Sequence, residues 1–217
     1  MKILYFLSTI LLFSFLIYGQ TPEYDSLMME NISLMKNASS LEEYQRVANT
    51  FEIFTYSMPG KWLPYYYGSY CFVQMSFLVE KKAKRDIFVN EAEKLIAIAD
   101  SLSPDNSEIY VLKGFIFQAF MNIEPMSRGM KYNKECLNMF KKAATLNPEN
   151  PRSYLWHSVQ LLNIPAFMGG GKDKALPYLE SALKYFESFK PESDISPDWG
   201  YTYAKMKFKE IKGSEKE

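Results

Sequence analysis

Two segments of the chain decide its fold: Ala92–Pro104, which reads AEKLIAIADSLSP, and Cys136–Pro148, which reads CLNMFKKAATLNP. Each begins with a small residue, followed at offsets of 4, 7 and 12 by an apolar residue, an alanine and a proline. Offsets of 4 and 7 place side chains on one face of a helix. Proline has no backbone N–H and cannot continue a helix. Each segment is therefore predicted to be a helix that packs one face and stops at a turn.

The same pattern recurs on either side of these segments. Weaker copies are Val47, Phe51, Phe54 and Pro59, and then Ala175, Leu179 and Ala182, the last without a proline at offset 12. Six residues after each of the first three prolines, an aromatic, a small and an apolar residue recur: Tyr65-Ser69-Phe72, Tyr110-Gly114-Phe117 and Tyr154-Ser158-Leu161. A small residue on one helix lets a bulky side chain of the next helix cross closely. The chain is thus predicted to be a series of helical hairpins.

We expect four hairpins, at about residues 24–57, 61–101, 107–146 and 151–189, and a short last helix from about 197 to 212. Ser40 and Glu43 form a capping-box pattern inside the first hairpin. No stretch alternates with a period of two for long enough to indicate a sheet. One hairpin cannot bury its apolar face alone, so neighbouring hairpins must stack. The predicted fold class is all α.

These anchors resemble the tetratricopeptide repeat (TPR) over about residues 24–190. The resemblance implies a right-handed α-α superhelix, in which the first helix of each hairpin lines an inner groove. The spacing differs, because Pro59 to Pro104 spans 45 residues and Pro104 to Pro148 spans 44, against about 34 in that family. The additional residues are expected within each hairpin, as longer helices or as loops that project from one end. A HEAT-type array, with a period of about 40–47, is the alternative.

Several short strings also resemble small exported repeat proteins of Bacteroidetes, a group without an assigned activity. These strings are residues 62–67 (WLPYYY), 125–129 (PMSRG), 167–172 (FMGGGK) and 196–200 (SPDWG).

The N-terminus has the features of a secretory signal peptide. Lys2 precedes an apolar run from Ile3 to Tyr18, which is shorter than the roughly 20 residues that a membrane-spanning helix needs. We therefore expect residues 1–20 to be a signal peptide and residues 21–217 to be the TPR-like repeat domain. The protein is then periplasmic or secreted, with an uncleaved membrane anchor as the alternative.

Charge and titratable residues argue against several functional classes. Lys and Arg number 25, as do Asp and Glu, so the net charge favours neither nucleic acid nor an anionic membrane surface as partner. His157 is the only histidine, whereas zinc and triad sites need several converging groups, so it is predicted to be a packing or surface residue. Gly169–Lys172 lacks the spacing of a phosphate-binding loop. We expect no cofactor, no metal and no enzymatic activity.

The two cysteines, Cys71 and Cys136, both fall within predicted helices. Cys136 occupies a small-residue position of the repeat, so packing in the core is expected. A disulfide between the second and third hairpins is the alternative in an exported protein.

An aromatic cluster in the second hairpin indicates a binding groove. In the implied superhelix the groove would be lined by Trp62, Tyr66, Tyr70, Gln74, Val111, Phe115 and Gln118. Rings beside amides suit the capture of a peptide or a small ligand. Alternatively, these rings only fill the space between hairpins. Arg128, in a predicted long loop of the third hairpin, can bind a carboxylate or phosphate, or can tie that loop to helix ends.

The sequence therefore predicts a non-enzymatic scaffold of the bacterial envelope that binds a protein or peptide. The alternative function is a periplasmic small-molecule-binding component that assists an envelope transporter. That alternative predicts an enclosed pocket lined by the same rings and by Arg128.

Overall fold

A computed structural model describes residues 22–213, and within that range the chain is helical without strands. The predicted signal peptide, residues 1–20, lies outside the described range. The helices are α1 (Pro22–Asn37), α2 (Leu41–Ser57), α3 (Trp62–Leu78), α4 (Lys82–Leu102), α5 (Ser107–Ile123), α6 (Pro125–Leu146), α7 (Pro151–Asn163), the short η1 (Ala166–Met168), α8 (Lys172–Ser188) and α9 (Tyr201–Gly213). None of these helices is both long and apolar enough to cross a bilayer.

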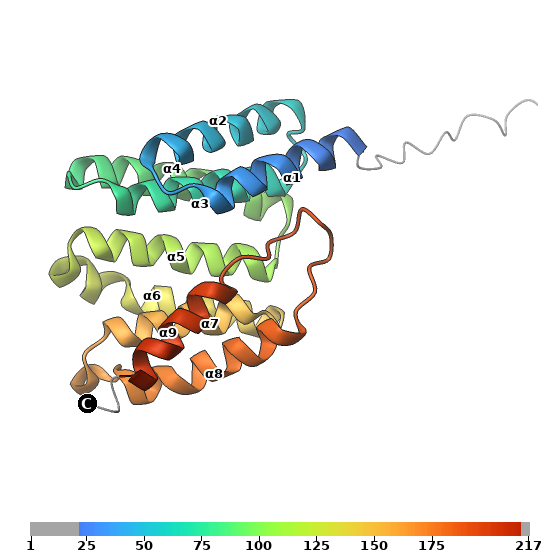
Figure 1. Ribbon diagram of the computed structural model, residues 1–217. Coiled ribbons are helices and arrows are strands. Elements are labelled where there is room, and N and C mark those ends of the chain that lie inside the picture. The colour runs from blue at the N-terminus through green and yellow to red at the C-terminus, as the bar shows by residue number, and fades with distance from the viewer. Residues whose placement is uncertain (1–21, 214–217) are drawn as a thin grey trace, which may run out of the picture.

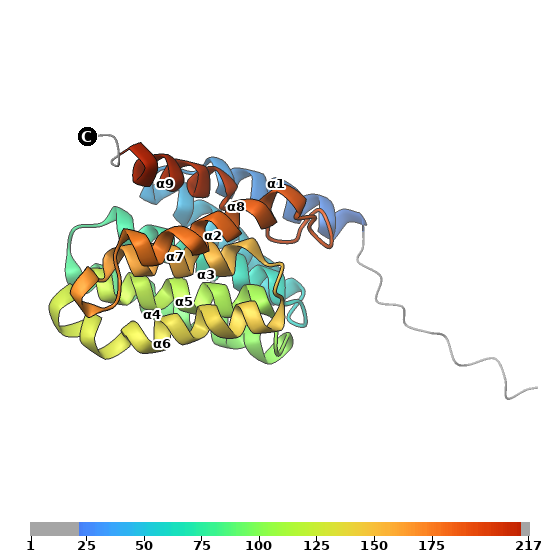
Figure 2. The same cartoon turned by 90° about the horizontal axis from the view of Figure 1, so that it is seen from below.

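The helices form four antiparallel hairpins, α1–α2, α3–α4, α5–α6 and α7–α8, which stack one beside the next (Figure 1). The predicted hairpins are confirmed. Helices α1 and α9 lie on one side of the molecule, across α3, α5 and α7, whereas α4 and α6 lie on the opposite side (Figure 2). The surface of α3, α5 and α7 that α1 and α9 flank is called the inner face below.

The small residues predicted to make the narrow helix crossings do so in three hairpins. The Ser69 hydroxyl donates to the Ala92 carbonyl at 2.8 Å, and the Ser158 hydroxyl donates to the Ala175 carbonyl at 2.9 Å. In the third hairpin the direction is reversed, because the Cys136 thiol donates to the Gly114 carbonyl at 3.4 Å. All of these residues are buried. The repeat pattern therefore marks points where two backbones approach closely enough for a side chain to bond to the neighbouring helix.

The additional length of the repeat lies in the helices. Helices α4 and α6 have 21 and 22 residues, and the turns that precede them contain only residues 79–81 and Glu124. Pro125 starts α6 immediately, because a proline is favoured in the first turn, where its missing N–H costs nothing. The long loop predicted around Arg128 was therefore wrong, and Arg128 lies in the first turns of α6.

Cys71 and Cys136 are both free and buried, so the disulfide alternative was also wrong. Burial raises the pKa of each thiol because the charged thiolate would lose its hydration. Both cysteines pack in the main core, as the repeat position of Cys136 predicted.

The crossing at Gly114 provides a test of the fold. A Cβ atom at Gly114 would meet the Phe140 ring, whereas a Cβ atom at Gly129, inside α6, has no heavy atom within 4 Å. We expect Gly114→Ala to lower the free energy of unfolding by about 1–3 kcal/mol through overpacking. Gly129→Ala should raise it by about 0.5–1 kcal/mol, since alanine is the better helix former. Urea unfolding followed by circular dichroism measures both, and equal effects would refute the close crossing.

Candidate functional site

A stack of four aromatic rings runs across the inner face. Phe77 of α3 lies 5.7 Å from Phe115 of α5, Phe115 lies 4.0 Å from Trp156 of α7, and Trp156 lies 5.5 Å from Tyr203 of α9, all between ring centroids. Successive ring planes differ by only 31°, 29° and 21°. Four helices therefore contribute one ring each to an ordered apolar surface, called the aromatic stack below.

Trp199 fills the inner face beside this stack. It belongs to the connection between α8 and α9, residues 189–200. Its ring centroid lies 4.9 Å from that of Tyr70 and 6.1 Å from that of Trp156, and its indole Nε1 donates to the Tyr66 hydroxyl at 3.0 Å. Trp199 is buried. The part of the groove expected to receive a ligand at Tyr66 and Tyr70 is thus occupied by the chain itself.

A buried ion pair holds this connection in place. The Arg152 guanidinium has no exposed side-chain surface, and it donates to both carboxylate oxygens of Glu108, at 2.7 and 2.6 Å. Its third nitrogen donates to the Trp199 carbonyl at 3.3 Å, and the guanidinium carbon lies 4.4 Å from the centre of the Phe189 ring. Burial alone lowers the pKa of Arg152, but the Glu108 carboxylate outweighs it and the pKa is raised. Arg152 therefore remains charged inside the protein.

Matching helix caps position the two charges. Asn106 caps α5 by accepting from the Glu108 N–H, and Asn150 caps α7 by accepting from the Arg152 N–H. Glu108 and Arg152 thus occupy equivalent positions, two residues after the capping asparagine, in neighbouring hairpins, and they carry opposite charges. Asn150 also donates to Glu108 at 2.9 Å. Sequence reasoning missed this pair, although the repeated signal of Asn followed two residues later by a charge was present.

Two further contacts attach the connection to the N-terminal hairpins. The Tyr67 hydroxyl donates to the Ile195 carbonyl at 2.8 Å, and Lys36 of α1 forms an ion pair with Asp198 at 2.7 Å. Burial raises the pKa of Tyr67 well above its ordinary value, so its hydroxyl stays protonated and remains a donor. Residues 195–199 therefore lie against the inner face at several fixed points.

The predicted groove residues divide into three groups. Trp62, Tyr66, Tyr70 and Phe115 share one cluster of rings, and Trp62 lies 5.6 Å from Tyr66 between ring centroids. Val111 and Gln118 are buried, and the Gln118 amide donates to the Trp156 carbonyl at 3.1 Å, whereas Gln74 is half-buried.

Arg128 lies apart from this cluster. It makes a bidentate ion pair with Asp86 of α4, with nitrogen–oxygen distances of 2.6 and 3.0 Å. The Arg128 hydrogen bond lowers the pKa of Asp86, so the pair stays charged. A hollow of about 340 Å³ beside Arg128 is lined also by Phe120, Tyr132 and Lys131. None of the predicted groove rings lines this hollow, because Arg128 lies in the first turn of α6 and its side chain pairs with Asp86 of α4.

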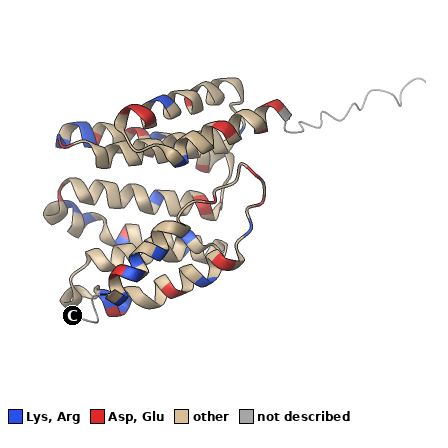
Figure 3. Ribbon diagram, viewed as in Figure 1, with Lys and Arg blue, Asp and Glu red and all other residues tan. Residues whose placement is uncertain are grey.

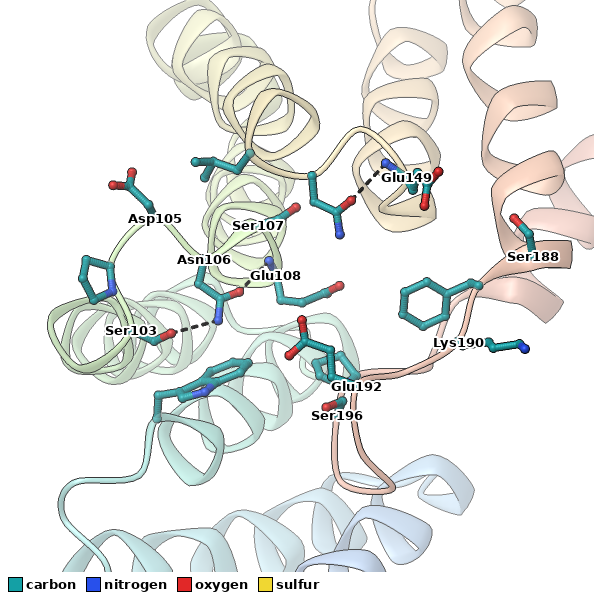
Figure 4. Close-up of a pocket in the computed structure, with 16 residues that line it drawn as sticks. Ser103, Asp105, Asn106, Ser107, Glu108, Glu149, Ser188, Lys190, Glu192 and Ser196 are labelled. Carbon is teal, nitrogen blue, oxygen red and sulfur yellow. Dashed lines mark hydrogen bonds between the residues drawn. The ribbon is translucent and has the colours of Figure 1, made fainter. Parts of the chain in front are cut away.

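A larger cleft, of about 630 Å³, opens where the turns between hairpins face the connection (Figure 4). Its rim is acidic, with carboxylates from Asp105, Glu108, Glu149 and Glu192, and Trp62 and Phe189 contribute rings. Asp105 pairs with Lys142 at 3.2 Å and Glu108 pairs with Arg152, so two of the four charges are already neutralised. Lys190 also lines the cleft, so Glu149 and Glu192 leave only a small excess of negative charge, which disfavours an anionic ligand.

His157 packs away from the inner face. Its ring lies 4.0 Å from that of Tyr178 in α8 and 6.3 Å from that of Phe140 in α6, between centroids, and it is buried. Of the two predicted roles, packing and surface, the structure shows packing. Burial lowers the pKa of His157 to about 4. Among residues 22–213, no three His, Cys, Asp or Glu side chains are grouped to hold a metal ion.

Removing the Trp199 ring tests how the inner face is filled. We expect Trp199→Ala to lower the free energy of unfolding by about 3–5 kcal/mol, since it leaves a cavity and an unpaired Tyr66 hydroxyl. Tyr56 of α2 is 76% exposed, so Tyr56→Ala should change the free energy of unfolding by less than about 0.5 kcal/mol. Urea titration gives both values. A Trp199 variant as stable as the Tyr56 variant would show that the connection does not pack as described.

His157 also makes stability depend on pH. Because its folded pKa is about 4 and its ordinary value is 6.5, the unfolded chain binds an additional proton between these values. The stability contributed by neutral His157 is therefore complete above pH 6.5 and is lost as pH falls toward 4. The measurement is the difference in unfolding free energy between wild type and His157→Phe across that window. A constant difference would contradict the burial of this ring.

Comparison with family models finds no match, and comparison with curated proteins finds none either. Among solved structures, the HusA haemophore of Porphyromonas gingivalis is similar, with 29% sequence identity and a TM-score of 0.80 over 90% of this chain and 96% of the haemophore. A thermophilic TPR protein of Thermus thermophilus shares 18% identity, with a TM-score of 0.64 over 88% of this chain and 81% of that protein. The chain is therefore a TPR-like helical repeat protein, as its small-residue pattern predicted, and it resembles a protein of Bacteroidetes, as its short strings predicted.

Proposed function

We propose that the chain is an exported, non-catalytic binding protein that carries haem or a related porphyrin on its inner face. The observation that carries the proposal is the similarity to a haemophore over nearly the full length of both chains. That similarity coincides with an aromatic surface of a kind that suits a flat, apolar ring system. The sequence alone favoured a protein or peptide ligand, with a small molecule as the alternative.

The aromatic stack has an accessible end. Phe77, its α3 member, is 37% exposed, and Leu78 beside it is also exposed. Aromatic rings gain about 0.5–1.5 kcal/mol from stacking beyond the burial of their area. A porphyrin stacked on Phe77 would add a further ring to the aromatic stack of Phe77, Phe115, Trp156 and Tyr203.

Stacking has to carry the binding in this proposal. The only histidine, His157, is buried between α7, α8 and α6, and its ring is stacked on Tyr178. An imidazole bond to iron would require α7 to turn about its axis. The proposal therefore assigns the affinity for the ligand to ring contacts and apolar burial, because no imidazole reaches the inner face.

A peptide ligand is the second candidate, and the TPR-like fold supports it. Against it stands the occupation of the inner face by residues 195–199, which lie there as a bound peptide would. A peptide at Tyr66 and Tyr70 would have to displace Trp199 and break its hydrogen bond. A flat ligand on Phe77 displaces nothing described.

Haemin titration tests the proposal. The chain without residues 1–20 is titrated with haemin and, separately, with iron-free protoporphyrin IX, and binding is followed by the Soret band and by quenching of tryptophan fluorescence. Both ligands should bind with similar affinity. Phe77→Ala should weaken both by at least about tenfold, since stacking and area are lost together.

Two controls make the outcome specific. Tyr56→Ala removes an exposed ring on α2 and should leave both affinities unchanged, as should His157→Phe. Loss of haemin binding in His157→Phe alone would replace stacking by iron ligation. Failure of both ligands to bind wild type would remove the porphyrin proposal in favour of a protein partner.

A further inference from the structure

One end of the molecule exposes large apolar side chains. The turns α3–α4, α5–α6 and α7–α8 all lie at this end, on the left in both views (Figures 1 and 2). Phe167 is 90% exposed, Met126 85% and Met130 79%, which makes them the three most exposed large apolar side chains of the described chain. Met168 is 60% exposed. Residues 79–86, 122–131 and 163–174 are called the tip below.

The apolar side chains of the tip come from neighbouring turns. The Gln160 amide of α7 donates to the Asn133 side chain of α6 at 2.8 Å. The two helices are antiparallel, so one further turn toward the tip brings Met130 of α6 level with the end of α7. Phe167 and Met168 follow directly in η1. The exposed apolar side chains of the tip therefore come from two neighbouring hairpins, α5–α6 and α7–α8.

The tip is also basic, although the whole chain is neutral. It contains eight Lys and Arg against four Asp and Glu, a net charge of +4. At the opposite end, residues 57–62, 100–110, 145–152 and 187–198 contain three Lys and Arg against eight Asp and Glu, a net charge of −5. Figure 3 shows blue where α4 begins and red along the connection from α8 to α9. The two ends of the helical hairpins thus carry opposite net charges.

Several cations of the tip are available to a partner. Lys82 pairs with Glu124 and Arg128 pairs with Asp86. Lys81, Lys84, Lys131 and Lys174 are exposed, and none of them has a carboxylate within ion-pair distance among the described residues. These lysines belong to the same three segments of the tip as Met126 and Phe167.

We propose that the tip docks on an anionic lipid bilayer. Phe167, Met126, Met130 and Met168 enter the interfacial layer, and the lysines contact lipid phosphates. A protein partner is less favoured, because lysine is depleted in protein interfaces and the most exposed apolar side chains, Phe167, Met126 and Met130, lie outside the hollow beside Arg128. The acidic end is repelled by the same surface, so the helices stand on end and the inner face remains in water.

Sedimentation with lipid vesicles tests the proposal in the chain without residues 1–20. Wild type should sediment with phosphatidylcholine vesicles that contain phosphatidylglycerol, much less with pure phosphatidylcholine, and less as salt is added. Lys81→Glu with Lys84→Glu should lower the partition coefficient by at least about thirtyfold, since each lost lysine contributes about 1 kcal/mol and each new carboxylate is repelled. Both changes place acids at the start of α4, where they favour the helix, so folding is preserved.

Matched variants separate the tip from net charge and from exposed apolar area in general. Lys141→Glu with Lys184→Glu changes the net charge equally but lies away from the tip, and should bind as wild type does. Met126→Ser with Phe167→Ser should weaken binding, whereas Ile53→Ser with Tyr56→Ser, exposed residues of α2, should not. Equal behaviour of tip and control variants would overturn the proposal, as would absence of binding to either vesicle. Self-association that the tip variants abolish, without vesicle binding, would show a protein interface instead.

Discussion

A charged guanidinium buried inside a helical repeat must find its partners within the protein, and Arg152 meets this constraint in a way that organises the inner face. Its partners are the Glu108 carboxylate, the Trp199 carbonyl and the Phe189 ring, which belong to α5 and to the connection between α8 and α9. Leaving a buried charge unpaired costs several kcal/mol. The connection between α8 and α9 is therefore held against the inner face by its contacts with the charged Arg152 guanidinium as well as by apolar contacts.

The position of Trp199 follows from that constraint and decides what the inner face can bind. Once Trp199 covers Tyr66 and Tyr70, the free aromatic surface is displaced toward Phe77, at the α3 end of the aromatic stack. A groove that would suit an extended peptide becomes a flatter surface that suits a planar ligand. The acidic cleft between the hairpin turns and the connection is lined in part by Trp62, and its charge disfavours an anionic ligand.

Although the chain has equal numbers of acidic and basic side chains, the two ends of the molecule carry opposite net charges. Acidic side chains gather at the turns between hairpins and basic ones at the turns within hairpins, where the exposed methionines and Phe167 also lie. Antiparallel hairpins place every second turn at the same end, so residues more than forty positions apart share a surface. In the proposed arrangement the tip meets lipid, and the ligand surface remains beside the helices and open to solvent.

The sequence by itself determined the hairpins, because their signals are local. Ser69, Gly114 and Cys136 are small at helical spacing wherever two helices of one hairpin cross, and Pro104 and Pro148 end helices whatever surrounds them. Local spacing also placed Tyr66 and Tyr70 on one helix face, whereas Phe115 was added to them only by the resemblance to a TPR superhelix. It could not show that the additional length enters the helices, because a turn of one residue and a long loop leave the same small-residue pattern.

Only the tertiary structure decided what covers the inner face and where the charges gather. Trp199 bonds to Tyr66 across 133 positions, and Tyr67 bonds to Ile195 across 128. No periodicity within a helix encodes such pairs, because they depend on how the chain returns after the last hairpin. The same reason hid the Glu108–Arg152 ion pair and the basic tip, since each forms only when stacked hairpins bring equivalent turns side by side.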